Sequence, residues 1–146
     1  MAIDPKYQHD VDIILSHRHH LGADYWTTSD KRLGKGSPFS CMDSTHMLLT
    51  LGMEATDPIL EAVADLFFSV WQSDGRFKIT PSGGILPCHT AYAVNLMCRL
   101  GYAMDERIQT TFRYFLDTPW DDGDGGATNF HMGEAPKLST QIRCRH

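Results

Sequence analysis

The stretch LGMEATDP at residues 51–58 decides the fold, because a similar stretch, LGYAMDER, recurs at residues 100–107. In both copies a Leu-Gly pair is followed by an aspartate, and the two aspartates are 48 residues apart. An Asp-Gly turn recurs at the same spacing, at residues 74–75 and 122–123. A period in this range is typical of one supersecondary unit stacked on itself. The sequence therefore predicts an all-α fold built from αα-hairpin repeats.

The helix signals support this interpretation. Aspartate favours the start of a helix, and glycine just past a helix favours its end. Together with the spacing of apolar residues, these signals predict five helices. The expected helices cover about residues 4–21, 37–51, 57–71, 87–100 and 105–118. Glycine, proline and polar residues dominate the segments between them, so residues 22–37 and 74–87 are expected to be loops.

The length and charge of the chain bound its class. With 146 residues and a hydrophobic fraction of 42%, it is long enough for one domain with a sizeable core. We expect a helical repeat domain over residues 1–126 and an irregular tail over 127–146. The net charge of -5 argues against nucleic acid as a partner. No membrane span and no signal peptide are evident, so a cytoplasmic location is expected, with cysteines as free thiols or metal ligands.

The turn after the third expected helix carries a family resemblance. Gln72, Asp74, Gly75 and Phe77 resemble the repeat of squalene-hopene cyclases and protein prenyltransferase β subunits. Those families form α/α toroids, in which inner and outer helices surround an apolar cavity for isoprenoids. The resemblance covers about residues 38–126, although Ala127 stands where the second turn should have an aromatic residue. A full toroid needs about twice as many hairpins, so the resemblance implies a partial α/α toroid.

The pair Cys88-His89 is the sharpest candidate for a metal site. The stretch from Gly83 to Tyr92 is similar to the opening of an inner helix in prenyltransferase-like repeats, where Cys and His contact zinc in some members. Zinc prefers thiolate and imidazole ligands in a tetrahedral set. The alternative is a small buried thiol beside a histidine bonded to a loop carbonyl. Further ligands, if zinc is the cofactor, would come from Cys41, His46, His131, Cys144 and His146.

Two other polar clusters are candidates for a catalytic site and for a metal site. Asp121, Asp122 and Asp124 resemble the acidic motifs of terpene synthases and are the candidate catalytic residues. The alternative is an ordinary inter-helix turn, because Asp and Gly supply caps and positive φ angles. His17 and His20 are three positions apart in the chain, at i and i+3, so they could share a metal ion. The alternative there is a solvated helix end that suits the helix dipole.

The sequence therefore leaves two hypotheses for the function. By resemblance, the chain is a prenyltransferase-like or squalene cyclase-like protein whose apolar cavity binds an isoprenoid or acts on it. The alternative is a non-catalytic helical scaffold that binds a protein partner, or itself, through an open apolar face. Self-association is expected because nothing caps the C-terminal end of the array. Phe67 and Phe115, 48 residues apart, are expected to be equivalent buried residues, and the expected contact residues are Phe112, Phe115, Leu116 and Trp120.

Overall fold

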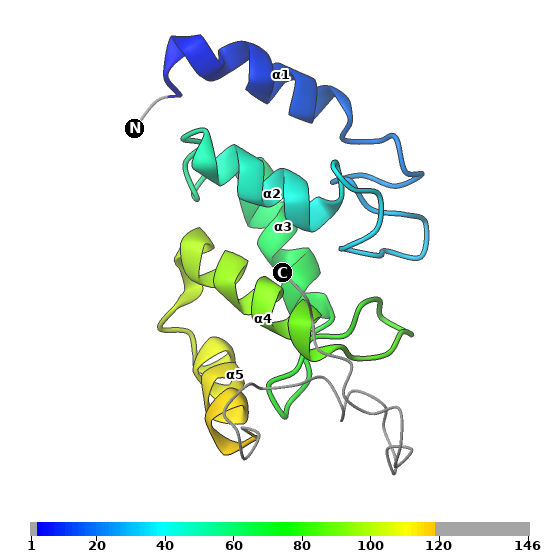
Figure 1. Cartoon of the computed structure of the whole chain (residues 1–146), viewed down its shortest axis with the longest axis vertical. Coiled ribbons are helices and arrows are strands. Elements are labelled where there is room, and N and C mark those ends of the chain that lie inside the picture. The colour runs from blue at the N-terminus through cyan, green and yellow to red at the C-terminus, as the bar shows by residue number, and fades with distance from the viewer. Residues whose placement is uncertain (1–2, 119–146) are drawn as a thin grey trace.

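The computed structural model of the chain describes residues 3–118, and this part is all-α (Figure 1). It contains no β-strand, only three isolated β-bridges in the loops. A short 3-10 turn, Pro5–Tyr7, precedes the first helix, and a π-helical turn, Cys98–Tyr102, extends the fourth. No helix in these residues is long and apolar enough to cross a membrane. The α-helices are α1 (Gln8–Ser16), α2 (Cys41–Thr50), α3 (Pro58–Ser69), α4 (Pro87–Met97) and α5 (Glu106–Asp117).

Helices α2 and α4 lie at the centre of the bundle, and the other helices pack against them. Helix α2 contacts α1, α3 and α4, and α4 in turn contacts α5. In Figure 1, α1, α2 and α4 follow one another down the view, while α3 passes behind α2 and α5 lies below α4. The core fills the space between these helices, and its largest fully buried side chains include Trp26, Phe67, Phe77, Leu48, Leu60, Leu96 and Met97.

Helices α3 and α5 start in the same way, as expected. Each is 12 residues long and begins directly after an aspartate, Asp57 or Asp105. Each aspartate is extended and accepts a hydrogen bond from the backbone N–H two residues later. Such a cap satisfies one of the N–H groups that the first turn leaves without a partner. Gly52 and Gly101, just before these caps, have φ angles of 101° and 97°.

The first two helices are shorter than the sequence predicts. Helix α1 ends at Ser16 and not near Leu21, because side chains occupy its last carbonyls. The indole Nε1 of Trp26 donates to the Ile14 carbonyl at 2.8 Å, and His17 Nδ1 lies 2.8 Å from the Ile13 carbonyl. Helix α2 begins at Cys41 and not near Pro38, because the hydroxyl of Ser40 caps it by accepting from the backbone N–H of Asp43.

The expected loops contribute to the core. Trp26 and Phe77 lie in these loops, and both are fully buried. Gly75 is also buried in the turn after α3, with a φ angle of 98°. A Cβ there would lie 2.8 Å from the carbonyl oxygen of Thr110, and the hydroxyl of Thr111 donates to the Gly75 carbonyl at 2.6 Å. The Asp-Gly turn is therefore a packing surface for α5, which requires glycine.

The expected equivalence of Phe67 and Phe115 is wrong in its burial. Phe67 is fully buried between helices, whereas Phe115 is only partly buried. Phe112 and Leu116, which were expected on the same apolar face of α5, are 38% and 76% exposed. Within residues 3–118, α5 packs on α4 and on the turn at Gly75, and its Arg107 lies over the ring of Phe68 on α3. Trp120, the last expected contact residue, lies outside the described residues.

Candidate functional site

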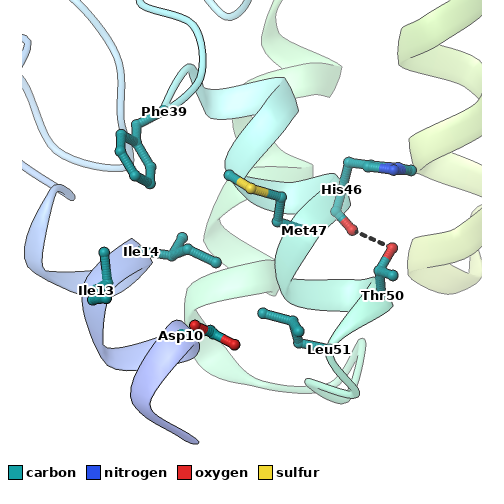
Figure 2. Close-up of a pocket in the computed structure, with 8 residues that line it drawn as sticks. All are labelled: Asp10, Ile13, Ile14, Phe39, His46, Met47, Thr50 and Leu51. Atoms are coloured by element: carbon teal, nitrogen blue, oxygen red, sulfur yellow. Dashed lines mark hydrogen bonds between the residues drawn. The ribbon is translucent and has the colours of Figure 1, made fainter. Parts of the chain in front are cut away.

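An apolar groove runs between α1 and α2 and has a volume of about 410 Å³. Figure 2 shows its lining, with α1 on one side and the turns of α2 on the other. Three of the lining residues are polar: Asp10 on α1, and His46 and Thr50 on the rim of α2. The volume and the apolar lining are typical of a small-molecule site. The apolar lining residues are Ile13, Ile14, Phe39, Met47 and Leu51.

The groove exists because neighbouring residues of α1 face different ways. Ile14 points into the core and is 4% exposed, whereas Ile13 remains 39% exposed on the groove side. Phe39, just before the cap of α2, closes one end and stacks on the ring of His17, with ring centroids 4.1 Å apart. The groove adjoins a second, more polar hollow of about 520 Å³, and the two share Thr50 and Leu51.

A row of polar side chains joins α2 to α4 next to the rim of the groove. The hydroxyl of Tyr92 donates to a carboxylate oxygen of Asp43 at 3.3 Å. Arg99 lies 2.7 Å from Nδ1 of His46 and donates to the Thr50 hydroxyl at 3.1 Å. A guanidinium has no acceptor, so Nδ1 of His46 accepts, and the imidazole is neutral in this arrangement. In Figure 2 the His46 ring points away from α1, toward the side of α4.

The electrostatics of this row favour proton donors. Burial, followed by the nearby carboxylate of Asp43, raises the pKa of Tyr92 to about 12. The phenol therefore keeps its proton and acts as a donor. Arg99 has no carboxylate within ion-pair distance among the described residues, which is unlike most arginines here. Arg18, Arg32, Arg76 and Arg107 each pair with a nearby aspartate.

The structure points the two residues of the predicted metal pair in different directions. Cys88 is exposed, whereas His89 is buried at the start of α4. Nε2 of His89 donates to the carbonyl of Lys78 at 3.1 Å, and burial lowers the pKa of its imidazole. This contact matches the alternative in which a histidine bonds a loop carbonyl. His89 thus ties the loop before α4 to the first turn of that helix.

The remaining metal candidates are scattered. Cys41 is fully buried, and burial raises the pKa of its thiol to about 12, which opposes the thiolate that zinc requires. His46 is committed to Arg99 through Nδ1. In residues 3–118 no group of three or more His, Cys, Asp or Glu side chains is placed to hold a metal ion. The other candidates, His131, Cys144 and His146, lie outside the described residues, so the zinc prediction stays a prediction.

The candidate catalytic acids Asp121, Asp122 and Asp124 also lie outside the described residues and stay a prediction. By contrast, the structure does bring His17 and His20 together, with their ring centroids 5.3 Å apart. Both belong to the turns that follow α1.

Sequence reasoning missed the row on α2 and α4, apart from His46. A signal was present, because Asp43, His46 and Thr50 have the spacing of one helix face. Their partners Tyr92 and Arg99 are about 50 residues away in the chain, and no local pattern links the two sets. Comparison of the whole chain with models of protein families, with curated proteins and with solved structures finds no match in any of the three.

Proposed function

We propose that the protein binds an isoprenoid-like apolar chain in the groove between α1 and α2. The observation that carries the proposal is the groove itself, with about 410 Å³ of space and five apolar lining residues. An apolar chain that leaves water for such a surface is stabilised in proportion to the area it buries. The resemblance to prenyltransferase-like and cyclase-like repeats supports an isoprenoid as the chain.

The proposal includes the architecture that the resemblance implies, a partial α/α toroid. In such an array the inner helices are neighbours and the outer helices repeat behind them. Helices α2 and α4 are in contact and share the polar row, and α3 and α5 have the same length and the same aspartate cap. On this interpretation α2 and α4 are the inner helices, and the row lies on their open face.

The polar end of the ligand is proposed to lie beyond Thr50, at Arg99. The guanidinium has donors to spare, because two of its nitrogens are held by His46 and Thr50 and no carboxylate neutralises it among the described residues. A guanidinium recognises an oxyanion through charge-assisted hydrogen bonds. An isoprenoid diphosphate should therefore bind more tightly than the corresponding alcohol. Conversion of that ligand would need the acids of residues 121–124, which is the enzyme function that the resemblance implies.

Binding of farnesol, measured by displacement of a fluorescent hydrophobic probe, tests the groove. Ile13→Asn puts a polar amide on the groove wall at an exposed position, so it should weaken farnesol binding about tenfold or more. Leu116→Asn is the matched control, since Leu116 is an exposed apolar residue on α5 that is remote from the groove. Equal affinity in both variants and the wild type would remove the groove as the binding site.

Farnesyl diphosphate tests the polar end. We expect the wild type to prefer it over farnesol by about tenfold, and Arg99→Gln to lose that preference while still binding farnesol. Arg113→Gln is the control, because Arg113 lies on α5 and also has no carboxylate partner in the described part of the chain. A preference that survives Arg99→Gln would show that the anionic end binds elsewhere.

A second candidate function, the self-associating scaffold, rests on the exposed apolar side chains of the α5 end. Met104, in the turn before α5, is 85% exposed, and Phe112 and Leu116 on α5 are 38% and 76% exposed. Exposed apolar patches of this kind often mark contact sites between proteins. If this face associates, the chain should be larger than its 16.5 kDa monomer by light scattering, and Leu116→Lys should return it to a monomer. A monomeric wild type would reject the scaffold proposal.

A further inference from the structure

We propose that His17 and His20 form a binding site for one divalent transition-metal ion, such as Zn²⁺, through their Nε2 atoms. The site lies just after the last residue of α1 and is distinct from the Cys88-His89 pair. Water would complete the coordination, since no group of three ligand residues is placed together in residues 3–118. The proposal does not depend on whether a ligand occupies the groove.

The hydrogen bonds of the two rings fix which nitrogen is free. Nδ1 of His17 lies 2.8 Å from the carbonyl oxygen of Ile13, and Nδ1 of His20 contacts the carbonyl oxygen of His17. A carbonyl oxygen only accepts, so both Nδ1 atoms carry the proton in these contacts. The lone pair of each neutral ring is then on Nε2, and neither Nε2 has a hydrogen-bond partner among the described residues. Metal-binding histidines are held in the same way, with the second nitrogen donating to a carbonyl.

The distance between the rings fits a shared ion. Zn–N bonds of about 2 Å at a tetrahedral angle place the centroids of two coordinating rings about 5 Å apart. The centroids of His17 and His20 are 5.3 Å apart, and the ring planes cross at 86°. One face of the His17 ring is covered by Phe39, which stacks on it at an interplanar angle of 10°. Both rings are therefore held near the separation that a bridging ion requires.

The local charge also favours a cation. The C-terminal end of α1 carries the negative end of the helix dipole. Arg18, the fixed positive charge between the two histidines in the chain, is paired with Asp24 at 2.9 Å, and this pairing lowers the pKa of the Asp24 carboxyl. His19 is the third imidazole of the segment, and it faces Asp24 with Nδ1 3.5 Å from a carboxylate oxygen. The ring nitrogens of His17 and His20 thus face no unpaired cationic side chain in this turn.

Metal titration of the 146-residue chain without an affinity tag tests the proposal. Calorimetry with Zn²⁺ as the probe should show one site, and His17→Gln and His20→Gln should each weaken it by about tenfold or more. His19→Gln is the matched control, because it removes an imidazole from the same turn and should leave the affinity within about twofold. Cys88→Ser should also leave the affinity unchanged. Retained affinity in both His17→Gln and His20→Gln, or its loss in Cys88→Ser, would overturn the assignment.

A second measurement uses the wild type alone and does not depend on the folding of a variant. In ¹⁵N NMR spectra of the histidine rings, Zn²⁺ should shift the Nε2 signals of His17 and His20, while those of His19 remain in place. Acidification should reverse these shifts, because protons compete with the metal for Nε2. Unshifted Nε2 signals at saturating Zn²⁺ would overturn the proposal, whatever the variants do.

Discussion

Helices α3 and α5 begin alike and end in different surroundings. They have equal length, an aspartate cap at the same place and a 48-residue offset. Their first buried positions also match, because Leu60 and Ile108, 48 residues apart, are both fully buried. Further along, Phe67 is fully buried and its counterpart Phe115 is not.

The difference follows from the neighbours of each helix. Helix α3 packs against α2, α4 and the π-helical turn, whereas α5 packs mainly on α4 and touches α3 through Arg107, which lies over the ring of Phe68. The two helices therefore share their length and their start, while the burial of each depends on the elements that pack on it.

The largest difference in stability is expected between truncations of the two phenylalanines, Phe67 and Phe115. Phe67→Ala should lower the free energy of unfolding by about 3 to 5 kcal/mol, because it leaves a cavity among fully buried side chains. Phe115→Ala should cost only about 1 kcal/mol, since its ring is partly solvated already. Chemical denaturation measures both. Equal losses would mean that α5 is covered as fully as α3, and the comparison would fail.

The next largest difference in stability is expected between substitutions at two glycines, Gly75 and Gly101. Gly75→Ala introduces a Cβ 2.8 Å from the Thr110 carbonyl in addition to a positive φ, so it should cost about 3 kcal/mol. Gly101→Ala has the same φ sign but open space around the new Cβ, so only the backbone strain of about 1 kcal/mol remains. Thermal unfolding of the two variants checks the order. A larger loss for Gly101→Ala would show that the turn does not pack on α5 as described.

The two caps should resemble each other. Asp57→Ala and Asp105→Ala should each cost about 1 kcal/mol, because each removes the acceptor for a first-turn N–H. The side chain of Arg107 lowers the pKa of Asp105 below its usual value. A depressed folded pKa stabilises the protein above the unfolded value of about 3.9 and loses that contribution as the pH falls through the folded value. Asp105→Ala should therefore be less stable than the wild type at pH 7. Denaturation at pH values down to 2 should show this difference in stability shrinking only as the pH falls through the folded pKa of Asp105.

The smallest expected effect is at Leu116. Leu116→Ser should change the stability by less than about 0.5 kcal/mol, because the side chain is 76% exposed. Urea denaturation at low protein concentration is the measurement, so that any association through this face does not contribute. A loss above about 1 kcal/mol would show that the side chain is covered within one chain.

Part of the fold could be predicted locally. The all-α class and the starts of α3 and α5 are confirmed, because an aspartate cap bonds a backbone N–H only two residues away. The C-terminal end of α1 was predicted too late in the chain, because the contact at that end comes from a distant residue. The indole of Trp26 takes a carbonyl 12 residues earlier in the chain, and helical periodicity carries no sign of that contact.

The same division between local and long-range determinants holds for the candidate sites and for the fold as a whole. The sequence alone determined the helix class, the aspartate caps, the Leu-Gly breaks and the glycine at residue 75, because each depends on the backbone preferences of a few adjacent residues. Only the tertiary structure decided which side of α1 faces a groove and which residue of α4 meets Asp43. It also decided that Phe115 remains partly exposed. Those outcomes depend on contacts between segments far apart in the chain, and such contacts form only when whole helices pack.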